Sequence, residues 1–165
     1  MKLKTRVILF ISLLVLVDQA VKIWIKTHMM IGDEYTVFSD WFKIHFLENN
    51  GMAFGLELGG TWGKILLTVF RVAAVAAIGW YIGNLARRKA PAGVIFCFAL
   101  IFCGAVGNII DSMFYGLIFE SSTAHVSSLL PAEGYAPFLQ GKVVDMLYFP
   151  LYEGYLPRWI PFWGG

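Results

Sequence analysis

The chain has 165 residues, of which 58% are hydrophobic, and its formal net charge at pH 7 is +2. This apolar content is too high for an ordinary soluble domain and favours a small membrane protein. The low net charge gives no reason to expect binding to nucleic acid. The three histidines are scattered along the chain, so the sequence predicts no metal site.

Three apolar runs, residues 7–25, 65–82 and 92–110, are long enough to cross the hydrocarbon core of a membrane. Basic residues precede the first run and follow the second, so both clusters lie on one side if each run crosses once. The positive-inside rule then predicts a cytoplasmic N-terminus, with the loop 26–64 and the residues after 111 outside. The expected fold class is an all-α polytopic membrane protein, a bundle of three transmembrane helices in a single domain, residues 1–165.

Part of the extracytoplasmic loop alternates between apolar and polar residues. Phe42, Ile44 and Phe46 are separated by Lys43 and His45. Because side chains on a strand point alternately to opposite faces, this period of two predicts a small β-hairpin on the membrane surface. A loop that is merely rich in aromatic residues is the alternative.

Two of the apolar runs carry polar residues on one face. Asp18 and Lys22 are four residues apart in the first run, so a helix brings them together as an ion pair. A charge inside a membrane costs at least ~2.5 kcal/mol, so such a pair marks a functional site, a helix-packing contact or both. In the third run, Gly104, Asn108 and Asp111 fall within roughly 60° on a helix, and this stripe is expected to face protein or a cavity.

Two further polar stretches lie outside the apolar runs. The turn 48–55 contains Asn49 and Asn50, whose amides are able to hydrogen-bond a substrate carbonyl or a carboxylate. Asp145 follows two valines, and a second carboxylate beside it would share a proton with it and activate water. Each stretch alone also fits a plain turn or a surface acid. The sequence has no zinc or serine peptidase motif, which leaves aspartate as the reacting residue type.

Taken together, four motifs resemble those of the lipoprotein signal peptidases, the bacterial type II signal peptidases. In chain order they are Asp18-Gln-Ala-Val-Lys22, Asn49-x-Gly51-x-Ala53-Phe54, Gly104-Ala-x-Gly107-Asn108-x-x-Asp111 and Val143-Val-Asp145. The resemblance implies an aspartyl endopeptidase that removes signal peptides from prolipoproteins whose lipobox cysteine carries a diacylglyceryl group. It also implies a monomer among the lipids of the bacterial cytoplasmic (inner) membrane, with an extracytoplasmic active site and no metal or cofactor.

The same resemblance implies roles for individual residues. Asp145 is expected to be one of two catalytic aspartates. The residues with an expected supporting role are Asp18, Lys22, Asn108 and Asp111. Those expected to contact the substrate are Asn49, Gly51, Ala53, Phe54 and Gly104.

The sequence departs from the family pattern in two ways. The family's second catalytic aspartate, in a Phe-Asn-x-Ala-Asp motif ahead of a fourth transmembrane helix, is expected beyond Gly165, the last residue of the sequence. We therefore expect a C-terminally truncated chain that is inactive. Ser112 replaces the usual arginine, and a long insert, 112–142, precedes Asp145 as an ordered surface loop and candidate lid.

Two alternatives stay open at this point. In the first alternative, Asp111 and Asp145 are themselves the catalytic pair. In the second, the chain is a non-catalytic membrane protein, either a packing subunit or an ion- or proton-conducting subunit whose relay groups are Asp18, Lys22, Arg71 and Asp111.

Overall fold

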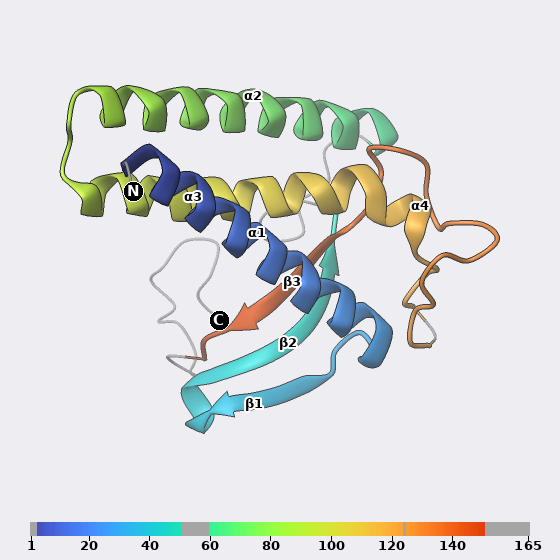
Figure 1. The fold of residues 1–165 in the computed structure, drawn as a ribbon. Helices are drawn as coiled ribbons and strands as arrows, with labels where there is room; N and C mark the ends of the chain where they lie inside the picture. The colour runs from blue at the N-terminus through green and yellow to red at the C-terminus, as the bar shows by residue number, and fades with distance from the viewer. Residues whose placement is uncertain (1–2, 51–59, 124, 151–165) are drawn as a thin grey trace, which may run out of the picture.

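The computed structural model describes residues 3–50, 60–123 and 125–150, and three long helices dominate it (Figure 1). Helix α1 spans Leu3–His28, α2 spans Gly60–Arg87 and α3 spans Ala92–Ile110. All three are long and apolar enough to cross a membrane. The three predicted apolar runs are therefore confirmed as helices, and the first two helices extend beyond their runs at both ends.

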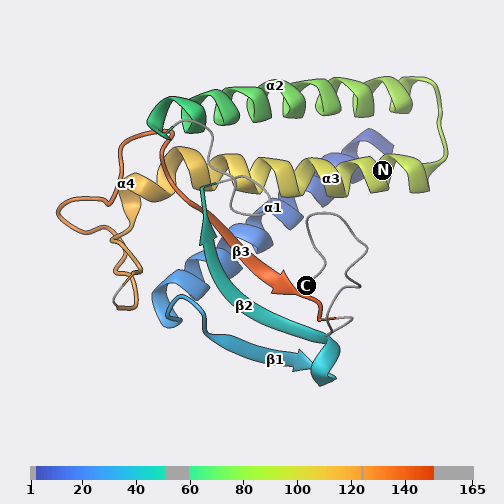
Figure 2. The same ribbon diagram turned by 180° about the vertical axis from the view of Figure 1, so that it is seen from behind.

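The exposed side chains of these helices suit a membrane. In the most apolar window of α1 and of α2 only 11% of the residues are buried inside the protein, against 28% in the span that begins with α3. Exposed apolar side chains at this density are unfavourable in water but stable against lipid chains. The third span is the most buried because α3 contacts both α1 and α2 (Figures 1 and 2).

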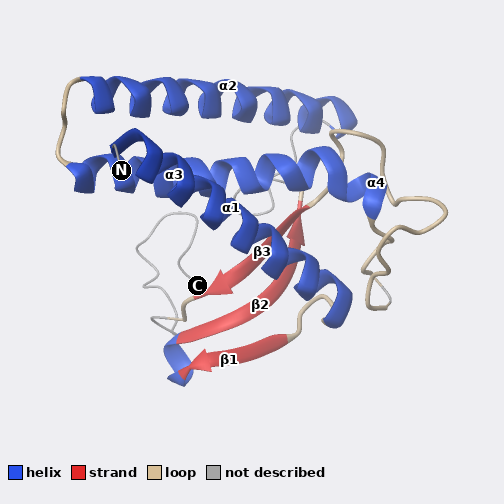
Figure 3. Ribbon diagram, viewed as in Figure 1, coloured by secondary structure: helices blue, strands red, loops and turns tan. Residues whose placement is uncertain are grey.

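A three-stranded antiparallel sheet accompanies the helices, with strand order β1-β2-β3 (Figure 3). Its strands are β1 (Glu34–Phe38), β2 (Phe42–Asn49) and β3 (Val143–Tyr148). A single 3-10 turn, η1 (Ser39–Trp41), joins the first two. The hairpin predicted from the period of two is confirmed as β1 and β2.

The sequence suggested a short strand before Asp145 only as the plainer interpretation of this stretch, and its partner was not predicted. The strand continues through Asp145, and Val143 and Val144 pair with Asn49 and Glu48 of β2. Both valines are buried, so this strand is anchored at its beginning. The pairing brings two polar segments, about a hundred residues apart in the chain, to one edge of the hairpin.

Beyond Ile110 the third helix continues into one π-helical turn, η3 (Asp111–Tyr115), and a short helix, α4 (Gly116–Ile118). Such a turn widens the helix locally and is frequent at functional sites. Here it buries Asp111 and Tyr115. Tyr115 joins a hydrophobic core that also contains Phe46 of β2 and Val144 of β3. This core fixes the sheet to the end of α3.

The insert predicted as a loop, 112–142, begins with the helical residues 112–118, and the rest of it, 119–142, is bonded to this helix end. Backbone amides of Gly141, Ala136 and Tyr135 donate to the carbonyls of Ser112, Gly116 and Phe119 at 2.9, 3.0 and 3.1 Å. A Cβ on Gly141 would overlap the carbonyl oxygen of Asp111, so only glycine permits this approach. This part of the insert is an ordered loop that packs backbone against backbone.

A glycine in α3 sets the distance between α3 and α1, and this gives a test of the packing. A Cβ on Gly107 would overlap Oδ2 of Asp18, whereas a Cβ on Gly104 would meet no atom within 4 Å. We expect Gly107→Ala to destabilise the protein by about 1–3 kcal/mol through overpacking. Gly104→Ala should leave stability unchanged or raise it, by up to about 1 kcal/mol, because alanine favours a helix.

Thermal unfolding of both variants in the same detergent measures the difference. Equal unfolding midpoints for Gly107→Ala and Gly104→Ala would contradict the close approach of the two helices.

Candidate active site

The polar residues of α1 and α3 meet at a buried carboxylate. Asp111 has no exposed surface. Its Oδ2 accepts hydrogen bonds from Nζ of Lys22 at 2.7 Å and from the backbone N–H of Val144 at 3.1 Å. Its Oδ1 accepts one from Nε2 of Gln19 at 3.1 Å. Both oxygens are thus occupied, and one side chain links α1, the end of α3 and β3.

Lys22 is the buried cation that balances this site. Besides Asp111, its Nζ donates to Oδ1 of Asn108 at 3.1 Å and lies 3.5 Å from Oδ2 of Asp18. Only 3% of its side chain is exposed. The ion pair predicted between Asp18 and Lys22 is therefore confirmed, but Asp111 is the nearer partner. The structure brings all four predicted supporting residues together.

Two residues complete this network without having been predicted. Gln19 donates to Asp18 and Asp111, and its Oε1 accepts a hydrogen bond from the hydroxyl of Tyr115 at 3.2 Å. Gln19 lies between the members of the ion pair, so its position in an apolar run is a usable sequence signal. Tyr115 gives no such signal, because it is one aromatic residue among many.

Asp145 lies on β3, half-buried, and the amide of Asn49 donates to its Oδ2. The register explains this contact, since Asn49 pairs with Val143. Asp145 is thus the diagonal neighbour of Asn49 on the same face of the sheet. The structure therefore places the predicted motif that contains Asn49 in contact with the one that contains Asp145.

A third helix adds a positive charge. Arg71 of α2 lies within electrostatic reach of both Asp145 and Asp111. The sequence marked it only as an interruption of an apolar run and as a relay group. Its position shows that α2, as well as α1 and α3, contributes to the site.

The remaining predicted residues are placed differently. Gly104 is exposed on α3, and the glycine buried against Asp18 is instead Gly107. Gly51, Ala53 and Phe54 lie outside the described residues. The roles predicted for all four stay predictions.

The partner predicted for Asp145 also lies outside the described residues. A second catalytic aspartate is expected beyond Gly165, and Gly165 itself belongs to the segment 151–165, which the structure does not describe. The second aspartate, the fourth transmembrane helix and the inactivity expected of a chain without them therefore stay predictions. Among the described carboxyl groups, that of Asp111 contacts the strand of Asp145, through the backbone N–H of Val144.

A second buried ion pair lies beside this site. Lys26 is fully buried, and its Nζ contacts Glu48 and Oγ of Ser122, the latter at 2.8 Å. Ser122 donates in turn to Oε1 of Glu48 at 2.9 Å. Nζ of Lys142 lies 3.3 Å from the other carboxylate oxygen. Glu48 immediately precedes Asn49, so this cluster fixes both the insert and the strand that contacts Asp145.

Aromatic rings enclose the cation of this pair. Nζ of Lys26 lies 5.0, 5.5 and 5.8 Å from the ring centroids of Phe119, Tyr135 and Phe46. Ring faces attract cations at such distances. Burial would raise the pKa of Glu48, but its hydrogen bond and charge contact with Lys26, helped by Ser122 and Lys142, outweigh burial and lower it.

Comparison with known proteins shows to which family this arrangement belongs. The family model described as signal peptidase (SPase) II matches residues 10–163. The chain belongs to the signal peptidase II family. The lipoprotein signal peptidase of Porphyromonas gingivalis is 48% identical over 157 residues, which cover 94% of this chain and 68% of that protein. That of Amoebophilus asiaticus is 37% identical over 156 residues, which cover 93% of this chain and 63% of that protein.

Two solved structures share the fold of this signal peptidase II chain. Both are described as a bacterial membrane enzyme determined by the in meso method. The 1.9 Å structure has a TM-score of 0.57 and 25% identity, covering 89% of this chain and 76% of that one. The 2.3 Å structure has a TM-score of 0.55 and 23% identity, with coverages of 89% and 71%. The resemblance inferred from the four motifs is thus confirmed for the family and the fold.

The lowered pKa of Glu48 predicts how stability depends on pH. A carboxyl group whose pKa is lower in the folded state stabilises the protein above its unfolded pKa, here near 4.5. That contribution is lost as the pH falls through the folded pKa. Glu48→Gln should remove it and, because Lys26 then lacks its buried partner, destabilise the protein by about 3–5 kcal/mol at pH 7.

Unfolding at several pH values between 3 and 8 measures this effect as the difference between the wild type and the variant. Glu133→Gln, which changes an exposed carboxyl group of the same insert, is the matched control and should follow the wild type. The assignment fails if Glu48→Gln matches this control at pH 7.

Proposed function

We propose that this chain is a lipoprotein signal peptidase in which Asp145 is one of two catalytic aspartates. The family match and the lipoprotein signal peptidases among its relatives support removal of signal peptides from prolipoproteins. The observation that carries the catalytic role is the position of Asp145. It is half-buried on a strand beside the helix ends, is held by Asn49, and lies within reach of the charge on Arg71.

The proposed chemistry follows from two carboxyl groups that share one proton. The ionised group removes a proton from a water molecule, whose oxygen attacks the carbonyl carbon of the scissile peptide bond. The other carboxyl group donates its proton to the carbonyl oxygen, which gives a tetrahedral intermediate. When this intermediate collapses, the C–N bond breaks, and the nitrogen leaves as an amine with the proton that the first carboxyl group took from water. The amide of Asn49 orients Asp145, and Arg71 stabilises negative charge in the site. No metal or cofactor takes part in this mechanism.

The contacts of Asp111 support a positioning role rather than a place in the pair. Its two oxygens accept hydrogen bonds from Lys22, Gln19 and the backbone of Val144, and it has no exposed surface. Three of the roughly four acceptor positions of this carboxylate are therefore used by protein donors, among them a buried cation, which suits a fixed contact. We infer that Asp111 holds the beginning of β3, and that the second aspartate is another residue, expected beyond Gly165.

The distribution of charge supports an orientation in the inner membrane. The basic residues Lys4, Arg6, Arg87, Arg88 and Lys89 lie where α1 begins and α2 ends, while the polar site lies at the opposite end of the helices. The positive-inside rule then gives a cytoplasmic N-terminus and an extracytoplasmic active site. Exposed aromatic side chains on the sheet and next to its strands, among them Phe38, Trp41 and Phe149, suit the lipid headgroup region.

The substrate proposed for this site is a prolipoprotein whose lipobox cysteine carries a diacylglyceryl group. Its apolar signal peptide would pack against the apolar spans, and its lipid chains stay in the bilayer. A monomer is sufficient for this chemistry. The alternative of an ion-conducting subunit has less support, because Asp18, Lys22 and Asp111 contact one another at one end of the helices rather than forming a path across them.

The catalytic role of Asp145 is tested by Asp145→Asn in the full-length protein. We expect cleavage of a lipid-modified prolipoprotein to fall at least ~100-fold, since an amide neither removes nor donates the required proton. The variant should still insert into the membrane and unfold at the wild-type temperature. Glu133→Gln is the control, and normal cleavage by Asp145→Asn would overturn the proposal.

The two roles assigned to aspartate are separated by Asp111→Asn. If Asp111 is a positioning residue, the variant leaves Lys22 without its closest partner and should be destabilised by about 3–5 kcal/mol. Differential scanning calorimetry in detergent measures this loss alongside the cleavage assay. Complete loss of cleavage with unchanged stability would instead assign Asp111 to the catalytic pair.

A further inference from the structure

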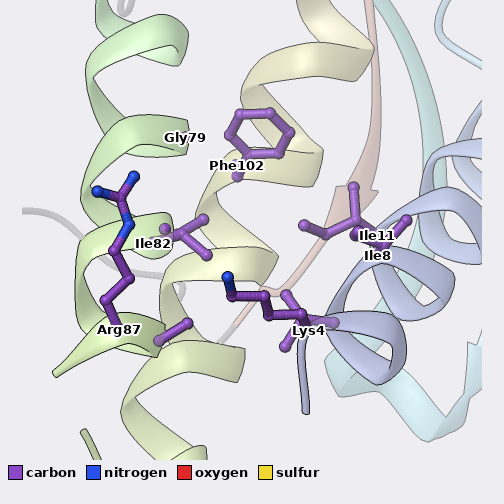
Figure 4. Close-up of a pocket in the computed structure, with 10 residues that line it drawn as sticks. Lys4, Ile8, Ile11, Gly79, Ile82, Arg87 and Phe102 are labelled. Atoms are coloured by element: carbon purple, nitrogen blue, oxygen red, sulfur yellow. The ribbon is translucent and has the colours of Figure 1, made fainter. Parts of the chain in front are cut away.

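A cavity of about 330 Å³ lies between α1 and α2, with Phe102 of α3 in its wall (Figure 4). It lies near the beginning of α1 and the end of α2, whereas Asp111 follows the last residue of α3, at the opposite end of the helices. It is therefore separate from the proposed active site. An apolar core of Val7, Ile82, Ile95 and Ala99 holds the three helices together beside it.

The lining of this cavity is amphipathic. Lys4 of α1 and Arg87 of α2 are its two charged residues, and the other eight lining residues are apolar or glycine. No acidic side chain lines it, and neither cation forms an ion pair with any described acidic residue. The cavity thus offers two positive charges beside an apolar wall.

Two glycines of α2 keep the cavity open. A Cβ on Gly83 would meet no atom within 4 Å, so the space beside this residue is unfilled. A Cβ on Gly79 would approach the ring of Phe102 to 3.1 Å. Larger residues at these two positions would fill the space between the helices.

We propose that this cavity binds an anionic phospholipid, with the phosphate between Lys4 and Arg87 and one acyl chain along the apolar wall. The two charges complement a phosphate, and basic residues at a membrane surface attract anionic headgroups. A soluble phosphate would make no contact with the apolar wall, whereas an acyl chain would pack against it. The ligand chemistry fits a glycerophospholipid of the surrounding leaflet.

Native mass spectrometry of the detergent-solubilised full chain tests the headgroup. The probes are phosphatidylglycerol and phosphatidylcholine with identical acyl chains. We expect one phosphatidylglycerol to be retained in preference to phosphatidylcholine. Lys4→Gln and Arg87→Gln should each reduce this preference about fivefold. The control pair, Arg88→Gln and Lys89→Gln, changes neighbouring basic residues that do not line the cavity and should retain it.

The proposed binding of the acyl chain is tested by a substitution that fills the cavity. Gly83→Leu should lose retention of both lipids, whereas Gly93→Leu should bind as the wild type does. Gly93 is the matched control because its Cβ position is also open but lies outside the cavity. Unfolding temperatures of both variants show whether each is folded, since leucine favours a helix more than glycine does.

Three results would overturn the proposal. The first is equal retention of the two lipids by the wild type, and the second is unchanged retention by folded Gly83→Leu. The third is displacement of the lipid by soluble glycerol phosphate at the same concentration, which would show a phosphate site without a role for the chain. None of these measurements involves peptide cleavage, so the lipid site stands or falls independently of the proposed catalytic function.

Discussion

The contact between Asp111 and Lys22 is the constraint on which the rest of the structure depends. It lies in the interior, where either charge alone would cost several kcal/mol, so the two must stay together and keep their remaining hydrogen bonds. Gln19 and the backbone of Val144 supply those bonds. One carboxylate thereby joins two transmembrane helices to a strand, and the height of that strand relative to the membrane follows from it.

The carboxylates of Asp111, Glu48 and Asp145 differ in the groups that contact them. Asp111 is enclosed and fully bonded, which suits a structural contact. Glu48 is also paired, and with Lys26 it holds the end of β2, where Asn49 is the next residue. Asp145 accepts a hydrogen bond from a neutral amide, that of Asn49. Two rigid ionic contacts thus hold the chain on either side of the proposed reacting group.

Local patterns in the sequence predicted the parts of the fold that depend on neighbouring residues. Apolar length predicted the three helices, a period of two predicted the hairpin, and a spacing of four predicted the pair of Asp18 and Lys22. The pairing of the third strand could not be predicted in this way, because its partner lies about a hundred residues earlier. Lys26 and Ser122 were missed for the same reason: a lysine at a helix end and a serine in a loop are ordinary until folding buries them together.

The insert between α4 and β3 has a mechanical consequence. Several backbone hydrogen bonds tie it to the helix end, and its Ser122 is locked to a fully buried lysine. A segment attached at so many points opens only when several bonds break together. In the proposed function, the substrate then has to reach Asp145 without displacing this segment.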